Sequence, residues 1–175
     1  MLLDMDGVLT DFAGAACRLF DREPPGPDDR GKAVHEVIGC PSRVLWARIE
    51  EAGLRFWDQL EPTEWADDLV SLAREAGELF IATSPAMDPA SGSAKLRWMQ
   101  KRFGRRFREF AITPRKDLLA QPGRLLVDDT PKHVEGFIAA GGAAVLFPTW
   151  ANGAREPGVD PLDAVRAALT AEGAA

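Results

Sequence analysis

From about Gly77 onward, short apolar runs alternate with amphipathic stretches, and this alternation constrains the fold more than any other feature. The apolar runs are continuous, as expected of strands that are buried on both faces of a parallel sheet. Strands and helices alternating at this spacing predict an α/β fold, a Rossmann-like doubly wound parallel sheet. The expected strands are 78–83, 110–113, 124–128 and 143–147, and the expected helices are 91–103, 131–140 and 161–170.

The segment 12–60 has a different character, because it shows helical periodicity and contains no strand candidate. It lies between a first expected strand, residues 1–3, and a helix expected to start at 61–64 with Pro62 in its first turn. We therefore expect a core domain of residues 1–11 and 61–175, with a helical cap, residues 12–60, inserted after the first strand. A helical insertion at the carboxyl edge of the sheet is placed to act as a lid. A packing appendage is the alternative.

Composition excludes several classes of function. The 175-residue chain is 46% hydrophobic and 27% charged, as in ordinary globular proteins, and its net charge of −6 argues against a nucleic acid polymer as partner. No apolar run approaches a membrane span, and no basic-then-apolar leader opens the chain. Cys17 and Cys40 lack metal-site spacing and are expected to be buried thiols of a reducing compartment. We expect a cytoplasmic protein without membrane contact, either a monomer or a homodimer.

Two carboxylates, Asp4 and Asp6, directly follow the first apolar run, and Gly7 behind them favours a tight turn. In open α/β sheets, ligands bind at the carboxyl ends of the strands. Two carboxylates at such a place can bind Mg²⁺, act as a nucleophile or transfer protons. A solvated turn would be the simpler interpretation of an isolated pair.

Three further polar motifs follow the later strands. Thr83-Ser84 ends the strand 78–83, Lys116 comes shortly after the strand 110–113, and Asp128-Asp129 ends the strand 124–128. Each motif alone is weak, since a hydroxyl pair often only caps a helix and lysines are usually solvated. Their order along the chain, each at an expected strand end, is difficult to explain by packing.

With these motifs the chain resembles the haloacid dehalogenase (HAD) superfamily phosphatases, and it is most similar to the 5′(3′)-deoxyribonucleotidase family. The resemblance covers most of the chain and is patchy in the insertion. It implies a HAD-like fold and Mg²⁺-dependent hydrolysis of a small phosphorylated substrate, with nucleoside monophosphates as the first expectation. Another small phosphorylated metabolite, or a non-catalytic phosphate-binding role, is the alternative. The matching stretches are 4–12, 56–62, 79–85, 95–98, 103–104 with Phe107, 112–116, 125–129, and 145–147 with Asn152.

The resemblance also implies roles for the acidic residues. Asp4 is expected to attack phosphorus and form an aspartyl-phosphate, while Asp6 serves as general acid and then general base. The metal ligands are expected to be Asp4, the backbone carbonyl of Asp6, and the pair Asp128 and Asp129. Which member of that pair contacts the metal directly is left open.

The substrate ligands are implied in the same way. Thr83 and Ser84 are expected to bind the phosphoryl oxygens with hydroxyl and N–H donors at a helix N-terminus. Lys116 is expected to neutralise the nucleophile and the transferring group, and Lys95 matches a second lysine near the phosphate. Phe12 is a retained substrate-binding aromatic residue.

The sequence departs from the family in the part that binds the base. At positions where the family has an aromatic pair in the insertion, this chain has Lys32 and Ala33. A further family tryptophan aligns near Glu51, and a family lysine aligns with Met87. Family members also usually begin earlier than Met1, which leaves open a misassigned start or a trimmed sheet edge.

Other candidates have simpler explanations. Trp46, Phe56 and Trp57 could form a different apolar pocket or the core of a small helical bundle, and both interpretations stay open. His35 and His133 lack metal-ligand spacing. The basic run at 101–108 is expected to be a solvated helix face, although it could attract anionic substrates.

Overall fold

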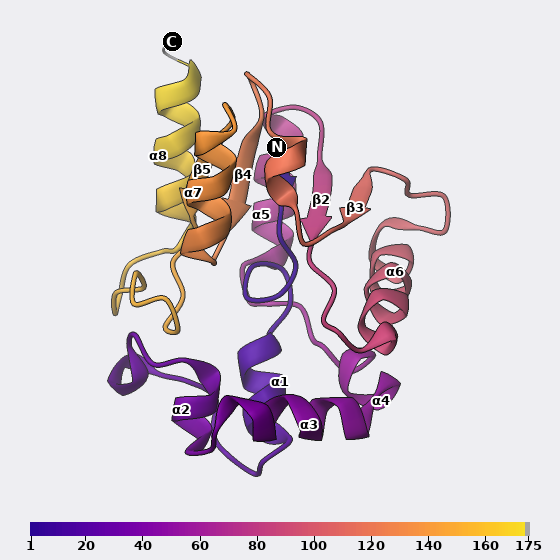
Figure 1. Ribbon diagram of the computed structural model, residues 1–175. Helices are drawn as coiled ribbons and strands as arrows, with labels where there is room; N and C mark the ends of the chain where they lie inside the picture. The colour runs from indigo at the N-terminus through magenta and orange to yellow at the C-terminus, as the bar shows by residue number, and fades with distance from the viewer. Residues whose placement is uncertain (174–175) are drawn as a thin grey trace.

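Five parallel strands form the sheet in the computed structural model, which describes residues 1–173. The strand order is β3-β2-β1-β4-β5, so β1 is central and pairs with both β2 and β4 (Figure 1). This arrangement confirms the predicted doubly wound parallel sheet. It also places the chain that leaves β1 at the middle of the carboxyl edge. The strands are β1 Leu2–Leu3, β2 Phe80–Thr83, β3 Phe110–Ile112, β4 Leu125–Asp128 and β5 Ala143–Leu146.

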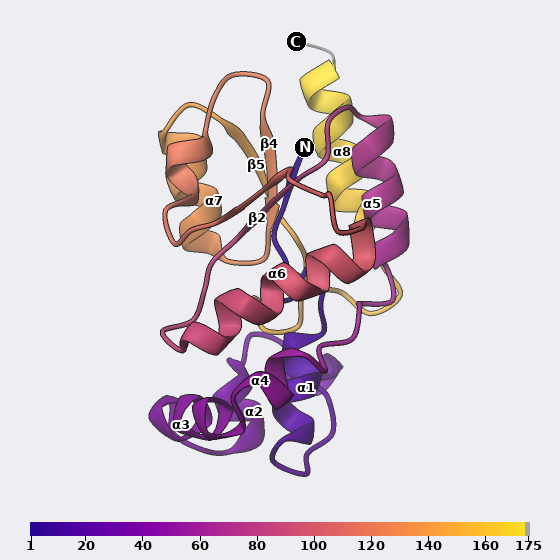
Figure 2. The same cartoon turned by 90° about the vertical axis from the view of Figure 1, so that its right-hand side faces the viewer.

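Helices cover both faces of the sheet. Successive side chains of a strand point to opposite faces, and Leu3 and Val127 accordingly pack in one cluster while Leu2 and Leu126 pack in another. The first cluster includes residues of α5 and α8 and the C-terminal half of α6, and the second includes Phe137 of α7 (Figure 2). These elements are α5 Ala66–Glu75, α6 Pro89–Phe103, α7 Pro131–Ala139 and α8 Leu162–Gly173, with the short helix η2 Lys116–Leu119 beside α7.

The segment between β1 and α5 is helical, as predicted, and lies beyond the carboxyl edge of the sheet (Figure 1). It has a hydrophobic cluster of its own, in which Leu45, Ile49 and Phe56 are buried and Ala94 of α6 takes part. The α4–α6 contact joins it to the rest of the molecule. Its description as a separate cap domain stays a prediction. Its elements are α1 Phe12–Arg18, η1 Pro27–Asp29, α2 Val34–Ile38, α3 Ser42–Ala52 and α4 Leu54–Trp57.

The two linkers that join this insertion to the core run side by side. The amide of Asp11 donates to the carbonyl of Glu61 at 2.9 Å, and Thr63 N donates to Leu9 O at 3.0 Å. Thr10 and Pro62 form an isolated antiparallel bridge. The prediction of a helix start at 61–64 is therefore wrong: the backbone there pairs with the other linker, and α5 begins only at Ala66.

Local capping accounts for other boundaries. α6 begins two residues before the predicted Ser91, because Asp88 caps it and Pro89 occupies its first turn. Cys17 is buried as expected, whereas Cys40 is partly exposed. Among residues 1–173, no helix is long and apolar enough to cross a membrane.

Candidate active site

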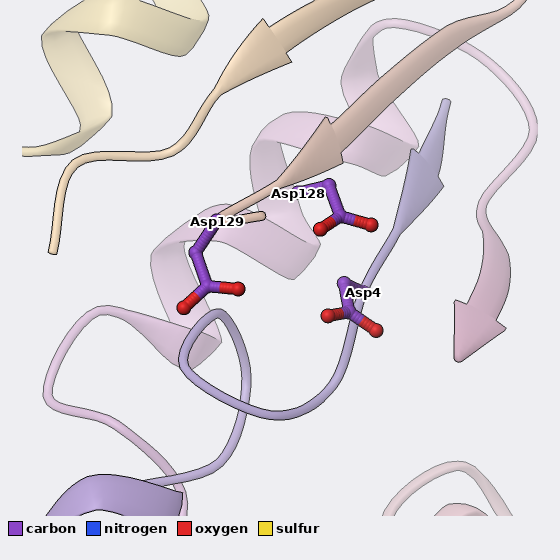
Figure 3. Close-up of side chains that lie close together, drawn as sticks. All are labelled: Asp4, Asp128 and Asp129. Atoms are coloured by element: carbon purple, nitrogen blue, oxygen red, sulfur yellow. The ribbon is translucent and has the colours of Figure 1, made fainter. Parts of the chain in front are cut away.

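Loops after β1 and β4 bring three carboxylates together at the carboxyl edge of the sheet. Figure 3 shows the side chains of Asp4, Asp128 and Asp129 close together at the ends of these two strands. Each residue offers one oxygen, and these oxygens lie within 4.8 Å of one another. Asp4 and Asp128 are buried. The fold thus unites acidic motifs that lie far apart in the sequence.

The acidic cluster carries more negative charge than the neighbouring lysines neutralise. Burial raises the pKa of Asp129 well above its ordinary value, and the carboxylates of Asp4 and Asp128 raise it further. Burial also raises the pKa of Asp4, although Lys116 acts in the opposite direction. A hard divalent cation prefers clustered carboxylate oxygens and would remove this repulsion. These three residues therefore fit a metal such as Mg²⁺.

Lys116 lies between two of the carboxylates. Its Nζ is 2.7 Å from Asp4 Oδ1 and 2.5 Å from Asp128 Oδ2, and its side chain is buried. Burial alone would lower the pKa of Lys116, but Asp4 and Asp128 outweigh burial and raise it. For Asp128, burial would raise the pKa, but the His133 hydrogen bond and Lys116 lower it. Lys116 therefore stays charged and fixes one oxygen of Asp4, which leaves the other free to react.

Asp6 has separate partners. Its Oδ2 is 2.6 Å from Lys95 Nζ, and its Oδ1 accepts a hydrogen bond from Thr10 Oγ1 at 3.1 Å. The turn that follows requires Gly7, which has a φ of +81°. A Cβ at Gly7 would overlap the carboxylate of Asp129. The turn thus holds Asp6 at the cavity while passing directly against the acidic cluster.

The hydroxyl pair at the end of β2, Thr83 and Ser84, is placed differently from the prediction. Thr83 is buried, and its hydroxyl accepts a hydrogen bond from Lys95 Nζ at 2.9 Å. Ser84 lines the cavity, but its hydroxyl donates to the carbonyl of Thr113 at 3.2 Å. The expectation that both lie at a helix N-terminus is wrong, since α6 begins only at Pro89. Thr83 supports Lys95, and Ser84 is the member of the pair that reaches the cavity.

A cavity of about 660 Å³ opens between the insertion and the carboxyl edge of the sheet. Asp4, Asp6 and Asp129 line one part of it, and aromatic side chains line others. The cavity is much larger than a phosphate group needs. It therefore has room for a substrate that carries a sizeable group beyond its phosphate.

The insertion contributes an aromatic wall to this cavity. Phe12 lies with its ring centroid 5.9 Å from Trp46, 5.9 Å from Trp57 and 5.7 Å from Phe56. Trp46 is 45% exposed and lines the cavity, as does the buried Trp57. Phe56 is buried and does not line this cavity. The two open interpretations thus each hold in part: Trp46 and Trp57 face the cavity, and Phe56 belongs to the core of the helices.

None of the four positions that depart from the family lies on the walls of this cavity, as far as the structure describes the chain. The Lys32 side chain pairs with Asp29 at 3.1 Å, and Met87 is fully exposed. Glu51 pairs with Arg48 on the surface of α3. Ala33, the remaining position, precedes α2.

Several site residues were missed at the level of sequence. His133 lines the cavity, and its Nδ1 lies 3.2 Å from Asp128 Oδ1. Its place in the first turn of α7, just after Asp128-Asp129, was an available signal. Asn152 donates from Nδ2 to the carbonyls of Asp129 and Phe147 at 2.8 Å each. Arg155 also lines the cavity, and no motif marks it.

The fold is that of the HAD-superfamily hydrolases. A haloacid dehalogenase-like hydrolase from Streptococcus pneumoniae is 15% identical and superposes with a TM-score of 0.55, covering 95% of this chain and 96% of that structure. A HAD-superfamily hydrolase of subfamily IA from Geobacter sulfurreducens is 12% identical with a TM-score of 0.51, covering 82% and 84%. At these identities the likeness concerns the fold alone.

Sequence comparison then gives the family. The family model described as 5′ nucleotidase, deoxy (pyrimidine), cytosolic type C protein (NT5C) matches residues 1–154, and the chain belongs to this family. The human cytosolic-type 5′(3′)-deoxyribonucleotidase is 36% identical over 144 residues, covering 74% of this chain and 69% of that protein. The human mitochondrial enzyme is 34% identical over 146 residues, covering 75% and 62%. The chain thus spans somewhat less than two thirds of the length of the mitochondrial relative.

Proposed function

We propose that this protein is a Mg²⁺-dependent phosphomonoester hydrolase that acts on nucleoside monophosphates through a covalent intermediate on Asp4. The observation that carries the proposal is the arrangement around Asp4 at the end of the cavity. One oxygen of Asp4 is fixed by Lys116 at 2.7 Å, and Asp6 lies two residues away with Lys95 as its partner. Family membership supports the same chemistry.

In the first step, the free oxygen of Asp4 attacks phosphorus while the bond from phosphorus to the ester oxygen breaks. Asp6, which enters this step in its protonated form, delivers that proton to the leaving oxygen, so that the product leaves as a neutral alcohol and Asp6 becomes a carboxylate. Thr10 and Lys95 hold the two oxygens of Asp6 and thereby fix its direction. Acid catalysis by a positioned carboxyl group contributes roughly 10²- to 10⁴-fold in rate.

In the second step, Asp6 removes a proton from a water molecule that attacks the same phosphorus. The bond between phosphorus and Asp4 breaks, inorganic phosphate leaves, and the Asp4 carboxylate is restored. Lys116 neutralises Asp4 throughout and needs no change in its own protonation state. The two-step route replaces one difficult displacement by two easier ones.

The metal is proposed to be held by Asp4, the backbone carbonyl of Asp6, Asp128 and Asp129. When bound, it supplies positive charge that stabilises the phosphoryl oxygens in the transition state. Asn152 anchors the Asp129 backbone, and His133 contacts one oxygen of Asp128. These contacts keep the carboxylates converging before any cation arrives.

The nucleotide preference is supported by the named relatives, which are 5′(3′)-deoxyribonucleotidases, and by the aromatic lining of the cavity. We place the phosphate at Asp4 and beside Ser84, with Lys95 contributing its charge from behind Asp6, and the nucleoside toward Phe12 and the other aromatic side chains. The cytoplasmic location stays a prediction, since the relatives include cytosolic and mitochondrial forms. The oligomeric state likewise stays a prediction.

The test compares p-nitrophenyl phosphate with a panel of nucleoside, sugar and amino-acid monophosphates. We expect turnover with Mg²⁺ and none with EDTA, and no turnover by Asp4→Asn. Asp6→Asn should lower kcat by roughly 10²- to 10⁴-fold, the usual size of acid–base help. Metal binding without turnover of any ester would instead indicate a silent phosphate-binding protein. A sugar or amino-acid phosphate hydrolysed far better than every nucleotide would reject the nucleotide preference and retain the phosphatase chemistry.

A further inference from the structure

Arg155 is the one lysine or arginine among the residues that line the main cavity, within the part of the chain that the structure describes. The other charged side chains on the cavity wall are acidic: Glu64 and Asp11, in addition to the carboxylates near Asp4. Lys95 and Lys116 lie buried behind the carboxylates that they neutralise. Arg155 is thus a cationic side chain on the cavity wall that is separate from Lys95 and Lys116, and it is a candidate for binding a part of the substrate.

The guanidinium of Arg155 is held between two indole rings. Its Cζ lies 4.8 Å from the ring centroid of Trp65 and 4.8 Å from that of Trp150. One terminal nitrogen pairs with Glu64 Oε1 at 2.8 Å, and the side chain is only 21% exposed. Cation–π contacts of this kind gain strength when the cation is partly desolvated. Because guanidinium donors point outward in the plane of the group, the edge not used by Glu64 stays available.

Hydrogen bonds hold the Trp65 indole and the backbone at Trp150 in place. Trp65 donates from Nε1 to the carbonyl of Val8 at 2.7 Å, and its ring also packs on Phe147 with centroids 5.4 Å apart. The carbonyl of Trp150 accepts from the amide of Gly31, in the insertion, at 2.7 Å. Arg155 is therefore preorganised, so that a ligand binding to it loses little additional conformational entropy.

Arg155 comes from a different part of the fold than the acidic cluster. It belongs to the loop that follows β5, and β5 lies two strands away from β1 in the sheet. Within the described residues, none of the side-chain contacts of Arg155 involves Asp4, Asp6 or Lys116. We therefore place Arg155 against the part of a substrate that lies beyond the phosphate.

We propose that Arg155, clamped between Trp65 and Trp150, is the specificity-determining residue that binds the edge of the nucleobase. A guanidinium fork pairs in its own plane with neighbouring acceptor atoms on a planar base. The edge of the base would then be recognised by an arginine of the core, while the aromatic side chains of the insertion that line the cavity contact the nucleoside. The inference rests on the proposed nucleotide phosphatase function and assigns the selectivity of that same site.

The experiment compares Arg155→Gln and Arg155→Lys with Arg166→Gln, a control in α8 whose arginine pairs with two exposed carboxylates. We expect both Arg155 variants to lower kcat/KM for deoxynucleoside 5′-monophosphates by about 10- to 100-fold more than for p-nitrophenyl phosphate. The lysine variant keeps the charge but lacks the planar fork, so it should not restore the activity. Thermal unfolding followed by circular dichroism checks that each variant is folded.

Binding is measured separately, by calorimetry with Mg²⁺ in an Asp4→Asn background. Replacing Arg155 should weaken the binding of a deoxynucleoside monophosphate and leave the binding of inorganic phosphate unchanged. An equal loss of binding for both ligands would assign Arg155 to the phosphate and overturn the inference. Full activity of Arg155→Lys, or no effect of either variant, would also overturn it. If the wild-type protein hydrolyses no ester but nucleotide binding still depends on Arg155, the inference stands and the proposed catalytic function fails.

Discussion

Asp129 stands out among the residues of the site because its nearest charged neighbours repel it. Lys116 is bonded to Asp4 and Asp128, and burial together with these two carboxylates raises the pKa of Asp129. Without a metal, ionised Asp129 therefore opposes folding. We expect Asp129→Asn to raise the melting temperature in EDTA and to abolish the stabilisation that Mg²⁺ gives to the wild-type protein. Thermal unfolding with EDTA and with Mg²⁺ measures both effects.

The raised pKa of Asp129 also sets how the stability of the metal-free protein depends on pH. A carboxyl group whose pKa is raised by folding binds its proton more tightly in the folded state. The contribution of this carboxyl group to the stability of the folded protein is fully present below the ordinary pKa of aspartate. It is lost as the pH rises through the raised pKa. Stability in EDTA should therefore fall over this range in the wild-type protein and fall less in Asp129→Asn. Asp28→Asn, at an exposed position, is the control and should leave the slope unchanged. Equal slopes in all three proteins would contradict the assignment.

At this scale the sequence predicted the acidic residues and Lys116, because each follows a strand and parallel strands place their ends at one edge. It did not predict His133, Asn152 or Arg155. Their partners are set by the path of a loop and by the turn at the start of α7, and hydrophobic periodicity carries no information on either. The direction of the Thr83 hydroxyl, toward Lys95, depends on packing in the same way.

Among the elements, the turn after β1 has the strictest requirement. Gly7 combines a φ of +81° with direct contact against Asp129, whereas Gly39, at +82°, has nothing within 4 Å of the place a Cβ would take. The backbone cost of alanine, about 1–2 kcal/mol, is common to both positions. Only Gly7→Ala also displaces a carboxylate of the acidic cluster.

We therefore expect Gly7→Ala to destabilise the protein by more than Gly39→Ala and to lose most of the stabilisation by Mg²⁺. Gly39→Ala should cost about 1–2 kcal/mol and retain the full response to the metal. Urea unfolding with and without Mg²⁺ separates the backbone cost from the loss of the metal site. A normal metal response in Gly7→Ala would show that the turn can shift without disturbing Asp129.

Periodicity predicted the type of most elements but not all of their limits. The strands after residue 77 were found because their apolar runs are continuous, and the helices because amphipathic stretches lie between these runs. The start of α5 was predicted too early, because a proline such as Pro62 is typical of the first turn of a helix. The pairing of the two linkers depends on both segments together, so neither segment predicts it from its own sequence. The order of the strands agrees with the doubly wound pattern that alternation favours.

At the scale of the whole molecule, three of the contacts between the insertion and the core stand out among residues 1–173. The paired linkers form one, and the contact of α4 with α6, which includes an ion pair of Asp58 with Arg97 at 2.8 Å, forms another. At the third, Arg30 donates from Nε to the carbonyl of Gly153 at 2.7 Å and pairs with Glu156 at 3.3 Å. This last contact joins the insertion to the loop that carries Arg155, so we expect it to help hold that side of the cavity closed.

Removing this contact should loosen the cavity without unfolding the protein. The ion pair of Arg30 is exposed and worth about 0–1 kcal/mol, so Arg30→Ala should change stability little. We expect a higher KM for the substrate and faster hydrogen exchange of the Gly31 amide, which is bonded to the carbonyl of Trp150. Arg48→Ala is the matched control, because Arg48 is an exposed arginine of the same insertion whose partner, Glu51, lies within α3. Unchanged exchange at Gly31 together with an unchanged KM would mean that the linkers and the α4–α6 contact alone hold the insertion in place.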